Sequence, residues 1–141
     1  MPDDVPEELL DRTAFLLRLA LNRAEALGER AIGSLGLTGR QYGILAMLKT
    51  GPATTQRRLG ATLGFDRTTT MKLMTSLQAQ GLIDRAPDAS DHRSYRLKLT
   101  EDGERLRTSA AEVLAECDDR FSAPLSPAEL EQLRALLRRL L

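Results

Sequence analysis

The chain has 141 residues and a formal net charge of zero, with 42% hydrophobic and 28% charged residues. This is the composition of one ordinary globular domain, and the lack of any run of 18 apolar residues argues against a membrane-spanning helix. The acidic start Met1-Pro2-Asp3-Asp4 is unlike a signal peptide, so we expect a cytoplasmic protein.

The first predicted element is a long helix over residues 4–34. Its apolar residues recur at helical spacing and form a broad stripe, namely Leu10, Ala14, Leu17, Leu21 and Ala24, widened by Phe15, Leu16 and Leu19. A stripe this broad favours more than one packing partner. A second helix is predicted over residues 38–49, where Thr38 and Gln41 have the spacing of a capping box and Gly51-Pro52 ends the segment.

Two short helices follow, with only a few residues between them. The first begins at Thr55, a suitable N-cap, and ends at Gly64. The second has Asp66 as its N-cap and runs through Gln80 until Gly81. Its apolar stripe leaves an opposite face that carries Arg67, Thr68, Thr69, Lys72 and Ser76. Short hydroxyl side chains beside two cations suit a helix that enters the major groove of DNA.

A hairpin with a long polar tip is predicted next. Residues 82–85 can begin one strand, and residues 95–99 alternate with period two, so Arg96 and Lys98 face away from the hydrophobic side. The segment 87–94 between them is rich in turn-forming residues. Near its end, Arg93 is placed to reach an adjacent minor groove.

Two more helices complete the chain. A long one follows Thr100 and is closed by Pro124, and the segment 126–129 then combines a capping box with proline at the first helical position. The final helix carries Leu130, Leu133, Leu137 and Leu140 at a 3-4-3 spacing. Because a small domain covers so many leucines poorly, we predict that the first and last helices interlock with those of a second copy. Leu10 and Leu17 of the first helix would join these four leucines in a two-fold dimer.

The order of helix, tight turn, helix and hairpin within residues 38–100 is that of a winged helix-turn-helix. Its residues resemble the MarR (multiple antibiotic resistance regulator) family of bacterial winged-helix repressors. The resemblance rests on Leu37-Thr38, Gln41, Leu45, Leu48, Thr55-Gln56, Leu59, Leu63-Gly64, Thr68-Thr69, Leu77, Gly81-Leu82-Ile83-Asp84-Arg85, Asp91, Arg93, Leu97, Leu99-Thr100 and Gly103. The most specific part is the Asp-x-Arg signature formed by Asp91 and Arg93.

The resemblance implies a mainly α fold with a small β-wing, built from about six helices and a two- to three-stranded antiparallel sheet. It implies a single domain over residues 1–141, in which residues 38–100 bind DNA and residues 1–36 and 101–141 form the dimer. In such a dimer two copies of helix 66–80 would lie about 34 Å apart, one turn of duplex, and read an inverted-repeat operator. By the same resemblance, Arg93 contacts the minor groove and Asp91 braces the wing.

In relatives of this family, small phenolic or other aromatic acids often bind between the first helix, the helix 38–49 and the long helix after the wing. Such an effector would release a repressor from DNA by favouring one arrangement of the two copies of helix 66–80 in the dimer. Tyr42 is the residue of this chain that we expect to line such a pocket. The alternative is that Tyr42 belongs to the core, with its hydroxyl at the edge.

The residues predicted to contact DNA are therefore Thr55, Gln56, Arg67, Thr68, Thr69, Thr70, Lys72, Ser76, Asp91, Arg93 and Arg96. For Thr70 an inward orientation is equally compatible with the pattern. Cys117 is the sole cysteine, so it cannot form an internal disulfide, and it is either an inert buried thiol or an oxidant sensor. His92 is the sole histidine, and without a second ligand it favours a phosphate or water contact over a metal.

The zero net charge conceals a segregated distribution. Residues 38–100 hold ten Lys or Arg against four Asp or Glu, a net charge of +6, and the remainder carries −6. A nonspecific architectural DNA-binding protein is the alternative function, which the zero overall charge and the patterned face of helix 66–80 disfavour. An enzyme is disfavoured because the sequence has no glycine-rich phosphate loop and no metal cluster. We expect no cofactor and no membrane partner.

Overall fold

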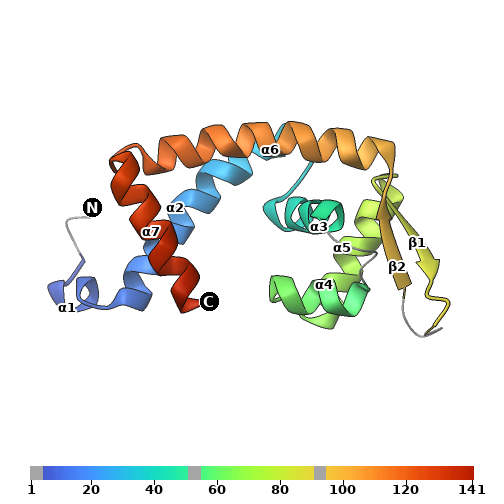
Figure 1. Cartoon of the computed structure of the whole chain (residues 1–141), viewed down its shortest axis with the longest axis horizontal. Helices are drawn as coiled ribbons and strands as arrows, with labels where there is room; N and C mark the ends of the chain where they lie inside the picture. The colour runs from blue at the N-terminus through green and yellow to red at the C-terminus, as the bar shows by residue number, and fades with distance from the viewer. Residues whose placement is uncertain (1–4, 51–54, 91–94) are drawn as a thin grey trace. The chain divides into compact units, whose positions relative to one another are not determined.

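The computed structural model describes residues 5–50, 55–90 and 95–141. Its elements in chain order are α1 (Glu7–Leu10), α2 (Thr13–Gly33), α3 (Gly39–Thr50), α4 (Gln56–Leu63), α5 (Arg67–Ala79), β1 (Ile83–Pro87), β2 (Tyr95–Leu99), α6 (Glu101–Ser122) and α7 (Pro127–Leu140) (Figure 1). The predicted mainly helical fold with a small antiparallel sheet is confirmed. In the part of the chain that the structure describes, no helix is both long and apolar enough to cross a membrane.

The chain divides into two compact units. The central unit comprises residues 32–112, and the end unit comprises residues 1–31 and 113–141. Helix α6 begins in the central unit and ends in the end unit. Each unit has a packing of its own.

The central unit has a dense hydrophobic core. Helices α3, α4 and α5 and the hairpin β1–β2 contact one another around it. Its fully buried large side chains are Ile32, Ile44, Leu45, Leu59, Met74, Leu77 and Ile83. The core therefore holds the two short helices and the hairpin in one fixed arrangement.

The hairpin is a two-stranded antiparallel sheet. Ile83 pairs with Leu99, Arg85 with Leu97 and Pro87 with Tyr95, so these six side chains share one face. Where a third strand would pair, the described residues form only one isolated bridge, between Thr55 and Arg96.

Gly103 anchors the start of α6 to the end of the hairpin. A Cβ at this position would lie 2.0 Å from the Leu82 carbonyl oxygen, so only glycine permits the approach. The Thr100 hydroxyl accepts from the Gly103 backbone N–H at 3.0 Å and donates to the Gly81 carbonyl oxygen at 2.6 Å. The hairpin and the first turn of α6 are thereby tied together.

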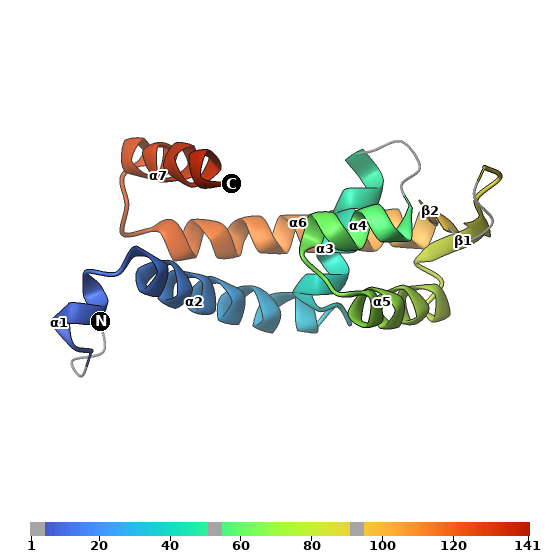
Figure 2. The ribbon, with the colours of Figure 1, turned by 90° about the horizontal axis from the view of Figure 1, so that it is seen from below.

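The end unit is much less enclosed. Within it the Cys117 thiol of α6 donates to the Leu27 carbonyl oxygen of α2 at 3.6 Å, and Figure 2 labels both helices. Among the described residues of this unit, Cys117 is the one hydrophobic side chain that is buried, at 7% exposure. Large exposed hydrophobic side chains include Leu16, Leu17, Leu21, Leu133, Leu136 and Leu140. The end unit thus leaves much apolar surface uncovered.

The prediction of one unbroken helix over residues 4–34 is wrong. A short α1 ends at Leu10, with Asp11 as its C-cap, and α2 starts at Thr13. The Arg12 N–H bonds to the Leu9 carbonyl at 3.0 Å in a tight turn, and the Arg12 carbonyl then accepts from Phe15 and Leu16 at the new start. Asp and Thr favour helix ends over helix interiors, which explains the break without glycine or proline.

The predicted start of α7 is confirmed. The Ser126 hydroxyl accepts from the Glu129 backbone N–H, and the Glu129 carboxylate accepts from the Ser126 backbone N–H at 2.8 Å. Hydrogen bonds from the Ser126 hydroxyl and then from the Ser126 backbone N–H to the carboxylate lower the pKa of Glu129. Pro127 occupies the first turn, where a missing N–H costs nothing.

Candidate nucleic-acid interface

The helix-turn-helix begins with α4, which is capped at both ends. The Thr55 Oγ1 accepts a hydrogen bond from the Arg58 backbone N–H at 3.3 Å, as an N-cap should. At the other end Gly64 has a φ of 69°, a left-handed conformation that glycine adopts without strain. Thr55 therefore has a local structural role, and its contact with DNA stays a prediction.

Asp66 caps the start of α5. Its carboxylate accepts from the Thr69 backbone N–H at 2.8 Å and from the Thr69 hydroxyl at 2.7 Å. These bonds from Thr69 lower the pKa of Asp66, because they stabilise the charged carboxylate. The Thr69 hydroxyl already donates to Asp66, so a DNA contact by Thr69 would use the acceptor lone pairs of that oxygen.

Thr70 faces the interior of the helix-turn-helix. Its side chain packs against Gly60 of α4, its hydroxyl donates to the Asp66 carbonyl oxygen at 2.8 Å, and the residue is only 3% exposed. With Met74 and Leu77, it forms the buried face of α5. The prediction that Thr70 contacts DNA is therefore wrong, because its hydroxyl is buried and already bonded.

The outward face of α5 is polar and basic. Thr68, Lys72 and Thr75 are exposed and form one row, since steps of four and three residues return to the same side of a helix. Arg67 is exposed beside them, and no acidic residue occurs in α5. Thr75 was missed at the sequence level, although its place three residues after Lys72 points to it. Such a row can donate to phosphates and reach base edges.

Ser76 is turned toward α3 rather than outward. Its Oγ accepts from Gln41 Nε2 at 3.2 Å and from Gln80 Nε2 at 3.1 Å. The Gln41 Oε1 in turn accepts from the Thr38 backbone N–H at 2.9 Å, which completes the predicted capping box of α3. Ser76 thus links α5 to α3, and its contact with DNA stays a prediction.

An open groove lies between α4, α5 and the hairpin. Its ten lining residues include Arg57, Arg67 and Arg85 but no acidic residue. Its volume of about 870 Å³ is far larger than the roughly 30 Å³ of one water molecule. Three guanidinium groups without a carboxylate among the lining residues make this a site of positive potential, suited to an anionic partner.

Arg85 is held at this groove from β1. Its Nη2 donates to Gln56 Oε1 at 3.1 Å, and its guanidinium lies 4.4 Å from the centre of the Tyr95 ring. Among the described residues, its Nε is the one buried side-chain nitrogen or oxygen without a hydrogen-bond partner. Gln56, predicted to contact DNA, therefore also positions Arg85, while its DNA contact stays a prediction.

Asp88 braces the base of the wing. Its Oδ1 accepts from the Ser90 hydroxyl at 2.6 Å and the Ser90 backbone N–H at 2.7 Å, and its Oδ2 accepts from Arg96 Nε at 2.8 Å. These bonds, first from Ser90 and then from Arg96, hold the pKa of Asp88 well below its usual range. Arg96 is thus engaged within the wing, though its side chain remains 54% exposed. The residues predicted at the wing tip, Asp91, His92 and Arg93, lie outside the described residues.

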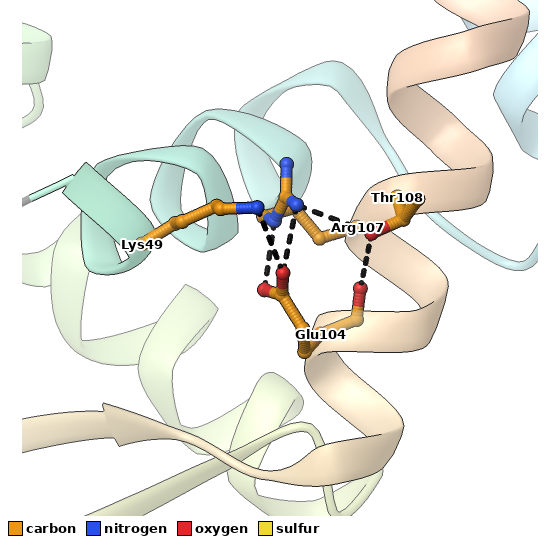
Figure 3. Close-up of polar contacts among 4 residues, drawn as sticks. All are labelled: Lys49, Glu104, Arg107 and Thr108. Atoms are coloured by element: carbon orange, nitrogen blue, oxygen red, sulfur yellow. Dashed lines mark hydrogen bonds and ion pairs between the residues drawn. The ribbon is translucent and has the colours of Figure 1, made fainter.

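An ionic cluster joins α3 to α6 inside the central unit. Lys49 Nζ lies 3.1 Å from Glu104 Oε1, and Arg107 reaches both oxygens of that carboxylate at 2.9 Å (Figure 3). Hydrogen bonds from Arg107 and then from Lys49 lower the pKa of Glu104 to about 2. Tyr42, the predicted effector contact, is half-buried on α3. A ligand contact by Tyr42 stays a prediction.

Groups associated with metal or thiol chemistry are sparse in the described ranges. No group of three or more His, Cys, Asp or Glu side chains there could hold a metal ion. Cys117 is buried, and its thiol donates to a backbone carbonyl. That environment favours the inert thiol over the oxidant sensor.

Comparison with known proteins places this sequence among transcriptional regulators. The model of the MarR family matches residues 35–94. A putative transcriptional regulatory protein for the hcr operon of Thauera aromatica is 33% identical over 105 residues, which are 74% of this chain. The match covers 63% of the Thauera protein, so it leaves more than a third of that relative outside the comparison.

Solved structures with the same fold extend the likeness to nearly the whole chain. A probable transcriptional regulator from Pseudomonas aeruginosa is 34% identical, with a TM-score of 0.85, and the match covers 94% of this chain and 99% of that one. The repressor CouR, solved bound to a 23-mer DNA duplex, is 26% identical over 95% of both chains, with a TM-score of 0.89. PcaV from Streptomyces coelicolor, solved with its natural ligand, is 28% identical over 96% of both chains, with a TM-score of 0.80.

Proposed function

Because this chain belongs to the MarR family of transcriptional regulators, we propose that it controls transcription by binding a specific sequence in double-stranded DNA. In this proposal α5 enters the major groove and Arg93 of the wing reaches the adjacent minor groove. Relatives named as repressors, and CouR bound to a duplex, support repression as the outcome.

The observation that carries this proposal is the outward row of Thr68, Lys72 and Thr75 on α5. These side chains are exposed, include a cation and have no acidic neighbour on the helix. The core residues beneath them and the Asp66 cap hold the row rigidly, so little conformational entropy is lost on binding. A rigid row of hydroxyl and amine groups favours sequence reading over nonspecific attraction.

The second part of the proposal is a homodimer built from the end unit. Leu133 and Leu140 on α7 are exposed by 37% and 70%, and Leu17 on α2 by 40%. Leu10, Leu130 and Leu137 are half-buried, so this copy covers them only partly. Exposed leucines on two helices of one unit favour an interface, and in this proposal a second copy supplies the matching helices. Two readers about 34 Å apart would then fit an inverted repeat.

The third part is an effector of the small aromatic acid class. Arg107 has only 11% of its side chain exposed and is paired with Glu104, and the half-buried Tyr42 belongs to the same unit. A guanidinium and a phenol within one unit supply groups that suit a carboxylate on an aromatic ring. PcaV, crystallised with its natural ligand, supports the expectation of a small-molecule effector. To alter the affinity for DNA, the bound effector would have to favour one arrangement of the two α5 helices of the dimer.

The test is selection of duplexes from a random pool by the purified protein, with and without aromatic acids. We expect enrichment of an inverted repeat, steep salt dependence of its affinity, and weaker binding by Arg93→Ala for every sequence. Equal competition by random duplex would instead assign the architectural function. Failure to retain any duplex would overturn DNA binding altogether.

A further inference from the structure

Met71 is an exposed hydrophobic residue on a helix face that the core does not use. It lies on α5, is 45% exposed and lines the groove between α4, α5 and the hairpin. The buried face of α5 is Thr70, Met74 and Leu77, and Met71 lies about 100° around the helix from Thr70. Packing of the central unit therefore does not account for a methionine at this position.

The position of Met71 is unusual within the central unit. Of the large hydrophobic residues described there, only Met71 and Tyr95 are exposed to this degree, and both line the same groove. One exposed apolar side chain on a surface is ordinary. Two exposed apolar side chains, Met71 and Tyr95, line one groove together with three arginines. This combination favours a partner that carries both negative charge and apolar groups.

Duplex DNA has this combination of groups. Phosphates along one strand match Arg57 and Arg67, which are exposed at the groove, and no carboxylate among the lining residues opposes them. In the major groove thymine alone presents an apolar group, the C5-methyl. A flexible, polarizable thioether fits such a methyl group well.

Resting on the proposed function, we infer that Met71 reads a thymine methyl group at one position of each half-site, while Arg57 and Arg67 hold the backbone of the same strand. Met71 is thus a specificity-determining residue beside the Thr68, Lys72 and Thr75 row. Tyr95, under the Arg85 guanidinium, forms the opposite side of the groove.

The test uses the operator duplex found by selection, with each thymine replaced singly by deoxyuridine, which lacks the methyl group. Dissociation constants are measured by fluorescence anisotropy at one fixed salt concentration. Wild-type protein should lose about fourfold in affinity at one thymine of a half-site, the effect of exposing one buried methyl group. Met71→Ala should bind the thymine and deoxyuridine duplexes equally at that position, while other positions keep their wild-type response.

Met71→Leu is the matched control, because it keeps an apolar side chain and should keep the methyl response. A second readout is the 13C-methyl signal of Met71, assigned by its loss in Met71→Leu. That signal should differ between the thymine and deoxyuridine complexes.

Three results would overturn the inference. The first is that no single thymine depends on its methyl group, and the second is that Met71→Ala keeps the wild-type response. The third is that the Met71 signal shifts with benzoate alone and is identical in the two DNA complexes, which would assign the groove to an aromatic acid. A wild-type protein that binds no unmodified duplex would instead contradict the proposed function itself.

Discussion

Gly60 of α4 and Thr70 of α5 approach so closely that a Cβ on residue 60 would lie 2.5 Å from Thr70 Oγ1. The contact cannot relax easily, because the Thr70 hydroxyl donates to the Asp66 carbonyl oxygen at 2.8 Å. Both residues also line the groove beside the proposed DNA-reading face. The distance between the two helices therefore sets the shape of that groove.

Gly60→Ala should destabilise the central unit by about 1 to 3 kcal/mol, the usual cost of forcing an extra carbon into a packed contact. The control is Gly43→Ala on α3, where the nearest atom to an added Cβ is 3.7 Å away. Alanine there should be neutral or stabilising, because glycine weakens helix interiors. The free energy of unfolding in urea gives both values. The Gly60→Ala/Thr70→Ala double variant should recover part of the loss, and an additive double variant would contradict the contact.

The local features of the helix-turn-helix and the hairpin were predicted well from the sequence. The caps at Thr55 and Asp66 and the stop at Gly64 depend on short-range hydrogen bonds and φ preferences, which a few neighbouring letters encode. The alternation in residues 95–99 likewise placed Leu97 inward and Arg96 outward. Such features are predictable because their partners lie within about four residues.

Features that depend on residues far apart in the chain were not predicted from the sequence. The orientation of Thr70 follows from Gly60 on another helix, and the brace of the wing from the pairing of Asp88 with Arg96 across the hairpin. Met71 was not predicted to contact DNA, because the residue type alone does not show whether a methionine is buried or exposed. The break at Asp11 had no glycine or proline to mark it. Helical spacing alone could have identified Thr75.

Glu104→Gln should remove a stabilising contribution that depends on pH. Arg107 and Lys49 lower the pKa of Glu104 from its ordinary value of 4.5 to about 2, so the folded state favours the charged carboxylate. The contribution is therefore complete above about pH 5 and is lost as pH falls toward 2. Urea unfolding at a series of pH values should show the difference between wild type and variant shrinking over that range. Glu116→Gln is the control, since the exposed Glu116 makes no ion pair with any described residue. A wild-type advantage that is the same at pH 2.5 and pH 7 would disprove this role.

Asp88→Asn should weaken DNA binding more than it affects the overall fold. The amide keeps the shape of the carboxylate but loses the charged acceptor that holds Ser90 and Arg96, so the wing that carries Arg93 is less well braced. Binding affinity for the selected duplex should fall severalfold, as measured by anisotropy, with little change in the urea midpoint. Asp84→Asn is the matched control, because Asp84 lies exposed on β1, the strand that ends just before Asp88. Equal losses in the two variants would mean that charge alone, and not the brace, matters.

Lys72→Ala should weaken binding to every duplex and lower the slope of log affinity against log salt by about 1, because one phosphate contact is lost. Thr75→Ala should instead change which base is preferred in each half-site, since a hydroxyl on this row reaches base edges. Arg139→Ala on α7 removes the same charge from the end unit and should leave the slope unchanged. An unchanged slope in Lys72→Ala would exclude this side chain from the phosphate contacts.

Leu140→Glu should dissociate the proposed dimer. Leu140 is 70% exposed on α7, and a carboxylate there would lose its hydration if a second copy covered it. Ala135→Glu adds the same charge to an exposed position on the opposite side of α7, about 140° from Leu140 by helical geometry, and should leave the assembly intact. Sedimentation velocity at micromolar concentration distinguishes the two variants, with wild type and Ala135→Glu expected as dimers and Leu140→Glu as a monomer.

The affinity for DNA gives a second measurement. Because two linked α5 helices bind far more tightly than one, the monomeric variant should also lose most of its affinity for an inverted repeat while keeping its weaker affinity for a half-site. A monomeric wild type, or full affinity of the Leu140→Glu monomer for an inverted repeat, would contradict the proposal that a dimer binds the operator.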